Sequence, residues 1–142
     1  MKNLSAKLLT LVNTQAVSGY EWYLGMPQSI QSLTNKKGIR MGDNLLVTIG
    51  KGKKKILISA HMDEVGFFIS KIEKDFVRVM PIGDIDIDKC IDKRLIFKIE
   101  NEFVLSKKLA KSKSFAELKV YGIKNPQLGA VGTFEKTISS ND

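Results

Sequence analysis

The chain has 142 residues, of which 43% are hydrophobic and 27% are charged, an ordinary composition for a soluble globular protein. This length supports one compact domain, or one domain with a subdomain. No apolar stretch approaches the roughly 20 residues of a membrane span, and Lys7 interrupts the apolar N-terminal segment that a signal peptide would need. Cys90 is the single cysteine, which excludes an internal disulfide and a cysteine metal cluster. We therefore expect a cytoplasmic protein that does not act at a membrane.

The net charge of +8 is uneven, because residues 1–60 carry +7 of it. The densest basic run, residues 51–55, lies between two apolar segments and is typical of a solvated hairpin tip. Nucleic-acid binding would favour aromatic side chains interleaved with the lysines, for stacking on bases. None is present in this run, so we expect no nucleic-acid partner.

The N-terminal segment predicts two helices. Apolar residues at helical spacing predict an amphipathic helix over residues 3–15. Ser18 and Glu21 have the spacing of a capping box, which predicts the start of a second helix that reaches the region of Leu33. Pro27 would remove a hydrogen bond inside that helix, so we expect a break near residues 25–26.

Alternating and continuous apolar runs predict a series of strands in the rest of the chain. The run at residues 55–60 is apolar on both faces, which is typical of a central strand in a covered sheet. Ser114 and Glu117 form a second capping-box pattern, which predicts a short helix that ends near Gly122. The predicted strands are residues 45–49, 55–60, 65–70, 76–80, 94–100, 102–105 and 130–135.

Four aspartates recur at even positions after Pro81, namely Asp84, Asp86, Asp88 and Asp92. Alternating aspartates resemble the start of a calcium loop, but that template continues with a glycine and a later glutamate. Lys89 and Cys90 follow instead. We therefore predict a connection with one polar and one apolar face.

The one histidine, His61, follows the apolar run Ile56-Leu57-Ile58 in the string His61-Met62-Asp63-Glu64-Val65-Gly66-Phe67. An imidazole at the end of a strand can bind a metal ion through one nitrogen, and a carboxylate two residues later can accept the N–H of the other nitrogen. The alternative is a structural histidine that is hydrogen-bonded and metal-free. The flanking strand and carboxylates favour a metal ligand.

The order of these motifs resembles the N-terminal part of the tetrahedral deblocking aminopeptidases, a dinuclear metallopeptidase group that includes glutamyl aminopeptidases and proteins labelled endoglucanases. The resemblance rests on Ser18-Gly19-x-Glu21, Gly42-Asp43-Asn44-Leu45, the histidine string and Pro81-Ile82-Gly83, with Tyr121-Gly122-Ile123 and Val131-Gly132-Thr133-Phe134 as weaker matches. It implies an α/β fold: part of the metallopeptidase sheet with flanking helices (residues 1–83), a shortened β-barrel-like (PDZ-like) dimerisation subdomain (residues 84–136) and a disordered tail (residues 137–142).

By this resemblance, His61 is a ligand of one zinc or cobalt ion, Asp63 is the catalytic-site residue that orients it, and Glu64 has no assigned role. The family's bridging aspartate, Glu-Glu pair and distal histidine have no counterpart in the sequence. A two-metal hydrolase needs all of these ligands and a general base. We therefore expect the metal to be absent or weakly bound and the isolated chain to be inactive.

Two functions remain open from the sequence. The chain is either a truncated or degenerate metalloaminopeptidase, whose family reaction releases N-terminal residues from peptides, or a non-catalytic oligomerisation or interaction module. The expected partners are further copies of the chain, or a complementary chain that carries the remaining ligands.

Overall fold

The computed structural model describes residues 4–111 and 118–136. The chain divides into two compact units, Met1–Asp63 and Glu64–Asp142. The domain boundary predicted at residue 83 stays a prediction. Among the described residues, no helix is both long enough and apolar enough to cross a membrane.

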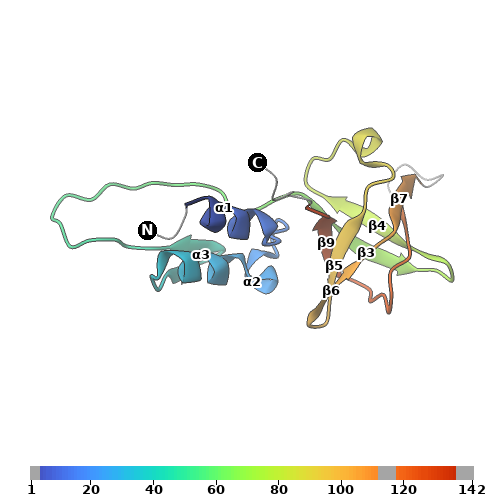
Figure 1. Ribbon diagram of the computed structural model, residues 1–142, viewed down its shortest axis with the longest axis horizontal. Helices are drawn as coiled ribbons and strands as arrows, with labels where there is room; N and C mark the ends of the chain where they lie inside the picture. The colour runs from blue at the N-terminus through green and yellow to red at the C-terminus, as the bar shows by residue number, and fades with distance from the viewer. Residues whose placement is uncertain (1–3, 112–117, 137–142) are drawn as a thin grey trace. The chain divides into compact units, whose positions relative to one another are not determined.

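The first unit contains three short helices: α1 (Leu4–Asn13), α2 (Glu21–Leu24) and α3 (Met26–Thr34). The predicted break between the second and third helices is confirmed, because Gly25 lies in the left-handed region with φ of 96° and Pro27 stands in the first turn of α3. Helices α1 and α3 lie side by side (Figure 1). The Thr14 hydroxyl donates to Ser29 Oγ at 3.1 Å and joins the end of α1 to α3.

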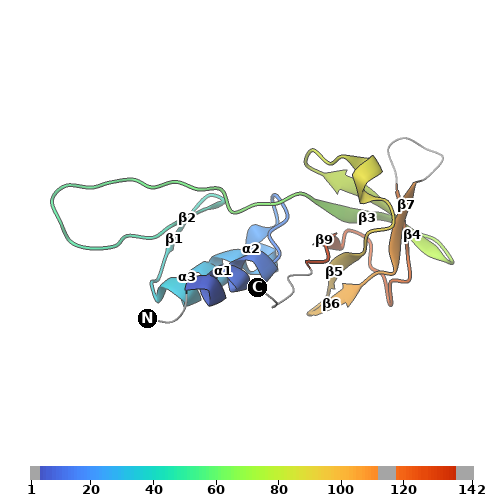
Figure 2. The same ribbon diagram turned by 45° about the horizontal axis from the view of Figure 1, so that its top comes forward.

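A two-stranded hairpin follows, in which β1 (Ile39–Met41) pairs with β2 (Asn44–Leu46) (Figure 2). Gly42, with φ of 61°, makes the turn. The strand predicted at residues 45–49 is therefore shorter than expected, and the predicted link at residues 38–44 contains β1. The Trp22 indole N–H donates to the Asp43 carbonyl at 3.2 Å, which holds the hairpin turn near α2.

The central strand predicted at residues 55–60 is wrong for this structure, because these residues form no strand. They belong to a long open loop that leaves β2 and returns to β3 (Figure 1). The apolar side chains of Ile56, Leu57 and Ile58 are 89%, 83% and 89% exposed. An apolar run becomes a strand only where a neighbouring strand supplies backbone hydrogen bonds, and no described strand lies beside this segment.

The second unit is a curled antiparallel sheet of seven strands in the order β6-β5-β9-β3-β4-β8-β7. The predicted hairpins are confirmed at β3–β4 and β5–β6, and the predicted last strand is confirmed at β9. At the β7 edge, Leu109 exchanges backbone hydrogen bonds with the segment before β5, donating to Lys93 and accepting from Asp92, each at 2.9 Å. The strands are β3 (Gly66–Ile72), β4 (Phe76–Ile82), β5 (Leu95–Ile99), β6 (Glu102–Leu105), β7 (Lys108–Lys111), β8 (Leu118–Tyr121) and β9 (Val131–Phe134).

The curled sheet encloses a core of fully buried side chains that includes Phe67, Val79, Phe97 and Val120. Gly132 allows β9 to lie close to β5. A Cβ atom at this position would stand 2.5 Å from the Ile96 carbonyl oxygen and 2.7 Å from the Phe97 ring. Only glycine fits between the two strands without moving their backbones.

The helix predicted to end near Gly122 is wrong at residues 118–121, which form β8. Residues 114–117 of that prediction lie outside the described residues, as does the predicted tail at 137–142. Leu118 and Val120 are buried and alternate with half-buried neighbours, a period of two that indicates a strand. At residues 118–121 this alternation is the better guide than the capping-box pattern, and β7 is not among the predicted strands.

The connection between β4 and β5 has the predicted polar and apolar faces. A short 3-10 helix, Ile87–Cys90, places Cys90 in the core. Asp86 forms an ion pair with Lys89 at 2.8 Å, and Asp88 forms one with Lys111. These carboxylates are neutralised by lysines and point outward.

The turn between β3 and β4 contains an ion-pair cluster that predicts an acid-dependent contribution to stability. Lys71 Nζ and Arg78 Nε lie 3.0 and 3.1 Å from Glu73 Oε1. The hydrogen bond from Lys71 holds the pKa of Glu73 below its ordinary value, and the hydrogen bond from Arg78 lowers this pKa further. The stabilisation is therefore present above the ordinary glutamate pKa and lost as the pH falls through the lowered pKa of the folded state.

We expect Glu73→Gln to lower the free energy of unfolding near neutral pH and to match the wild type in acid, where both side chains are neutral. Urea unfolding at a series of pH values measures this difference. Asp75→Asn, in the same turn but outside the cluster, is the matched control. A deficit in Glu73→Gln that is the same at every pH would contradict the prediction.

Candidate functional site

His61 lies in the first unit, near the end of the open segment that precedes β3, and its side chain is 85% exposed. Its Nδ1 stands 3.1 Å from Asp63 Oδ1 and 3.1 Å from the Asp63 carbonyl oxygen. Both neighbours are hydrogen-bond acceptors, so a neutral ring must carry its proton on Nδ1 and donate it to them. Nε2 is then left with a free lone pair. The hydrogen bond to Asp63 is the one that the sequence predicts; the role of His61 as a metal ligand stays a prediction.

Asp63 Oδ1 accepts a hydrogen bond from His61 Nδ1 at 3.1 Å. Partial burial by itself would raise the pKa of the Asp63 carboxyl, but the hydrogen bonds from His61 and Ser18 outweigh it and hold the pKa below its ordinary value. The carboxylate is therefore the charged form that accepts the imidazole N–H.

Ser18 belongs to a tight loop before α2. The Tyr20 backbone N–H donates to the Val17 carbonyl at 2.8 Å, and the Gly19 N–H donates to Glu21 Oε1 at 3.1 Å. The predicted capping box is therefore wrong in its geometry: Tyr20, not Ser18, precedes the helix, and no side chain caps it. Glu21 instead closes the loop through its hydrogen bond with Gly19.

Glu64 lies in the second unit and forms an ion pair with Lys136 at 2.8 Å. Its side chain is mostly buried, with 27% exposed. The carboxylate therefore has a structural partner within its own unit.

The described residues do not by themselves fit a complete metal site. Within residues 4–111 and 118–136, no group of three or more His, Cys, Asp and Glu side chains could hold a metal ion. Zinc requires about three or four protein ligands. His61 offers one suitable nitrogen, Asp63 is occupied in orienting it, and Cys90 is buried in the core of the second unit.

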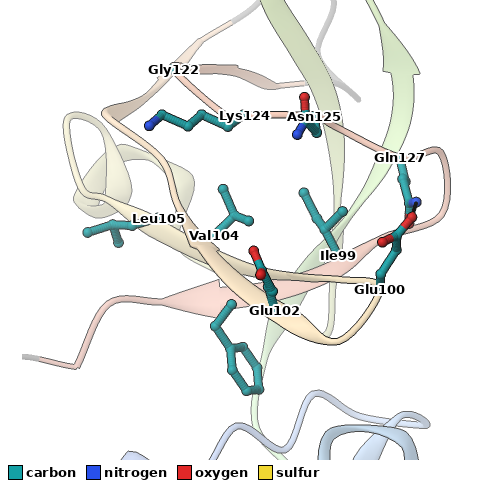
Figure 3. Close-up of a pocket in the computed structure, with 10 residues that line it drawn as sticks. Ile99, Glu100, Glu102, Val104, Leu105, Gly122, Lys124, Asn125 and Gln127 are labelled. Carbon is teal, nitrogen blue, oxygen red and sulfur yellow. Dashed lines mark hydrogen bonds between the residues drawn. The ribbon is translucent and has the colours of Figure 1, made fainter.

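A pocket of about 620 Å³ lies in the second unit between the β5–β6 hairpin and the loop at residues 122–127 (Figure 3). Its floor includes Ile99 and Val104, and its rim includes Glu102 and Lys124. Glu100 accepts a hydrogen bond from Gln127 at 3.0 Å across one end. The described residues that line the pocket include no histidine, cysteine or serine, so they offer no hydroxyl or thiol nucleophile and no soft metal ligand.

Comparison with solved structures identifies the fold. The chain superimposes on an aminopeptidase from the archaeon Desulfurococcus kamchatkensis with a TM-score of 0.76 and 24% identity, covering 95% of this chain and 44% of that one. It superimposes on PhTET1-12s, a dodecamer in its crystal, with a TM-score of 0.76 and 20% identity, covering 96% of this chain and 47% of that one. The mixed α/β architecture with its curled antiparallel sheet is therefore the fold of these proteins.

Sequence comparison identifies the family. A predicted aminopeptidase of Acetivibrio thermocellus is 41% identical over 59 residues, which are 41% of this chain and 18% of that protein. The chain thus spans less than half the length of each of these three proteins. Residues 43–116, just over half of the chain and including His61 and Asp63, match the M42 glutamyl aminopeptidase family. The chain therefore belongs to the M42 glutamyl aminopeptidase family.

Proposed function

We propose that this chain forms the N-terminal part of a metalloaminopeptidase unit and contributes His61 as one ligand of its two-metal site. The observation that carries this proposal is the orientation of the imidazole. Asp63 accepts the Nδ1 proton, so the exposed Nε2 presents its lone pair outward. Metal-binding histidines are held in this way by a carboxylate on the other ring nitrogen. Membership of the M42 family supports the same assignment.

In such a site, a pair of zinc or cobalt ions would polarise the scissile carbonyl and lower the pKa of the attacking water. Within the described residues, only His61 is placed as a candidate ligand. The remaining ligands and the general base therefore belong to polypeptide other than these residues. The chain alone is inactive under this proposal, and peptides are the substrates of the completed unit.

The first unit has exposed apolar side chains, and these support the proposal that the rest of the catalytic unit covers part of its surface. Ile56, Leu57 and Ile58 are more than 80% exposed, and Leu4 and Leu8 on α1 are 71% and 53% exposed. Burying such side chains is favourable by about 1.5–3 kcal/mol each. We infer that strands of the completed catalytic unit pair with residues 56–58 and cover them.

We also propose that the completed protein forms a homo-oligomer through the curled sheet of the second unit, acting as a PDZ-like dimerisation subdomain. The likeness to a protein that crystallises as a dodecamer supports this assembly.

The isolated chain is expected to bind zinc or cobalt weakly, because one imidazole supplies a single ligand. Isothermal titration calorimetry of the full chain measures this, with His61→Ala and Cys90→Ser as paired variants. Tight stoichiometric binding that disappears in His61→Ala and survives in Cys90→Ser would show a complete site in the isolated chain and contradict the prediction.

A chimera tests the proposed function. The matching N-terminal segment of the Desulfurococcus kamchatkensis aminopeptidase is replaced by this chain, and hydrolysis of leucyl and glutamyl anilides is measured with added zinc or cobalt. We expect aminopeptidase activity in the chimera, and none in the isolated chain.

His61→Ala in the chimera is expected to lower kcat/KM by at least about 10²-fold, since an outer-shell change alone costs about 10- to 100-fold in metal affinity or activity. Ser32→Ala, an exposed position on α3, is the matched control and is expected to change nothing. A chimera that folds and assembles but shows no activity above its His61→Ala form would favour the non-catalytic module and contradict the proposal.

Leu57→Asp tests the covered surface. In the isolated chain this exposed position is expected to change the free energy of unfolding by no more than about 0.5 kcal/mol. In the chimera, where we expect Leu57 to be buried, the same change is expected to lower the Tm markedly because a charge is then buried without a partner. Leu128→Asp, at a position 66% exposed in the second unit, is the control. An equal Tm for the Leu57→Asp and unsubstituted chimeras would overturn the inferred burial.

A further inference from the structure

We propose that β6 and the pocket beside it bind an extended peptide segment, which adds to the curled sheet as an antiparallel strand. The segment carries an apolar residue, then any residue, then a basic residue. All residues of this site lie in the second unit. The site uses neither His61 nor a metal ion, so the inference is independent of the proposed function.

Strand β6 is the free edge of the seven-stranded sheet. It pairs with β5 on one side, and no described strand pairs with it on the other. The opposite edge is different, because Leu109 of β7 exchanges backbone hydrogen bonds with Lys93 and Asp92. An open strand edge presents N–H and C=O groups that another backbone can pair with.

The register of the β5–β6 hairpin shows which backbone groups point outward. A two-residue turn places Ile99 opposite Glu102, so these two residues form the hydrogen-bonded pair that closes the hairpin. Bonded and non-bonded pairs alternate along an antiparallel ladder. The bond from the Ser106 N–H to the Leu95 carbonyl at 2.7 Å has the same phase. The N–H and C=O of Phe103 therefore point away from β5.

The pocket lies on the inner face of this free edge. Residues that stand opposite each other in an antiparallel pair have their side chains on the same face. Val104 stands opposite the buried Phe97, and Glu102 stands opposite the buried Ile99. Figure 3 shows Val104, Glu102 and Ile99 directed into the space between the hairpin and the loop at residues 122–127.

The walls of the pocket are already in place without a ligand. Its volume of about 620 Å³ lies within the range of about 300–1,000 Å³ that is typical of ligand pockets. The Lys107 N–H donates to the Tyr121 carbonyl at 2.8 Å, and the Gln127 side chain donates to Glu100 at 3.0 Å. These two hydrogen bonds tie the loop at residues 122–127 to the hairpin.

The geometry of an added strand defines what the peptide carries. We take the antiparallel direction, because all the strand pairs described in this sheet are antiparallel. The peptide residue opposite Val104 points into the pocket and contacts apolar side chains. The residue two positions later stands opposite the exposed Glu102, where a basic side chain forms a cross-strand ion pair. The residue between them makes both of its backbone hydrogen bonds to Phe103.

Charge favours such a peptide over a second copy of β6 as the occupant. Strand β6 has the sequence Glu-Phe-Val-Leu and contains no basic residue, so a second β6 leaves Glu102 without a cation. Lys107 and Lys108 follow β6, but both are held at Tyr121 of β8 by backbone pairing. They do not extend the β6 strand toward a second copy.

Fluorescence anisotropy of the full-length chain tests the site, with the labelled peptide Ser-Thr-Leu-Thr-Lys-Thr-Ser as the probe. We expect this peptide to bind more tightly than its reversed sequence, Ser-Thr-Lys-Thr-Leu-Thr-Ser, which has the same composition. N-methylation of the threonine between leucine and lysine is expected to abolish binding, because it removes the hydrogen bond to Phe103. N-methylation of the lysine is the matched control, since that N–H points away from β6.

Variants of the chain test the same contacts from the protein side. Glu102→Gln is expected to weaken binding by about 2- to 5-fold, and Glu102→Lys is expected to prefer the peptide with glutamate in place of lysine. Phe103→Pro removes the outward N–H and leaves the ladder with β5 intact, so we expect it to lose binding. Asp75→Lys, an exposed charge reversal outside the pocket, is the control. A backbone amide spectrum checks that each variant is folded.

Three results would overturn the inference. The first is no binding at millimolar peptide, or equal binding of the forward and reversed peptides. The second is equal binding of the two N-methylated peptides, which needs only the unsubstituted chain and so remains decisive if a variant does not fold. The third is a dimer in sedimentation velocity that Phe103→Pro dissociates and the peptide does not, which would identify a second copy as the occupant of β6.

Discussion

The pairing of backbone hydrogen bonds decides which apolar segments of this chain become part of a sheet. In the second unit every strand has a neighbour, and the curled sheet covers Phe67 and Phe97 from water. Gly132 contributes to this sheet, because its lack of a side chain lets β9 lie close to β5. In the first unit the equally apolar segment at residues 56–58 has no neighbouring strand among the described residues, and it stays open and exposed. Segments of similar apolar character therefore have opposite outcomes.

The candidate site depends on a second set of contacts that the sheet does not provide. The His61 ring is oriented by its hydrogen bond to Asp63. This hydrogen bond lies within the first unit and joins residues two positions apart in the chain.

Prediction from the sequence succeeded where local pattern and local geometry agree. The β3–β4 and β5–β6 hairpins join strands that are adjacent in the chain, and the helix break at Gly25 follows from a glycine beside a proline. It failed where partners lie far apart in the chain. The segment 118–121 was given to a helix although β4 and β7 make it a strand. For the site, the motif predicted the His61–Asp63 contact, whereas the contact of Glu64 with Lys136 joins residues 72 positions apart and needed the fold.

The sequence by itself determined the family, the candidate ligand His61 and its carboxylate, because these depend on the order of residue types along the chain. The tertiary structure alone decided that residues 55–60 are not a strand, that Glu64 pairs with Lys136, and that Tyr20 rather than Ser18 precedes the second helix. The physical reason is common to all three. Each outcome depends on which hydrogen-bonding or charged group the fold brings within about 3 Å, and that neighbour is not recorded in the local pattern.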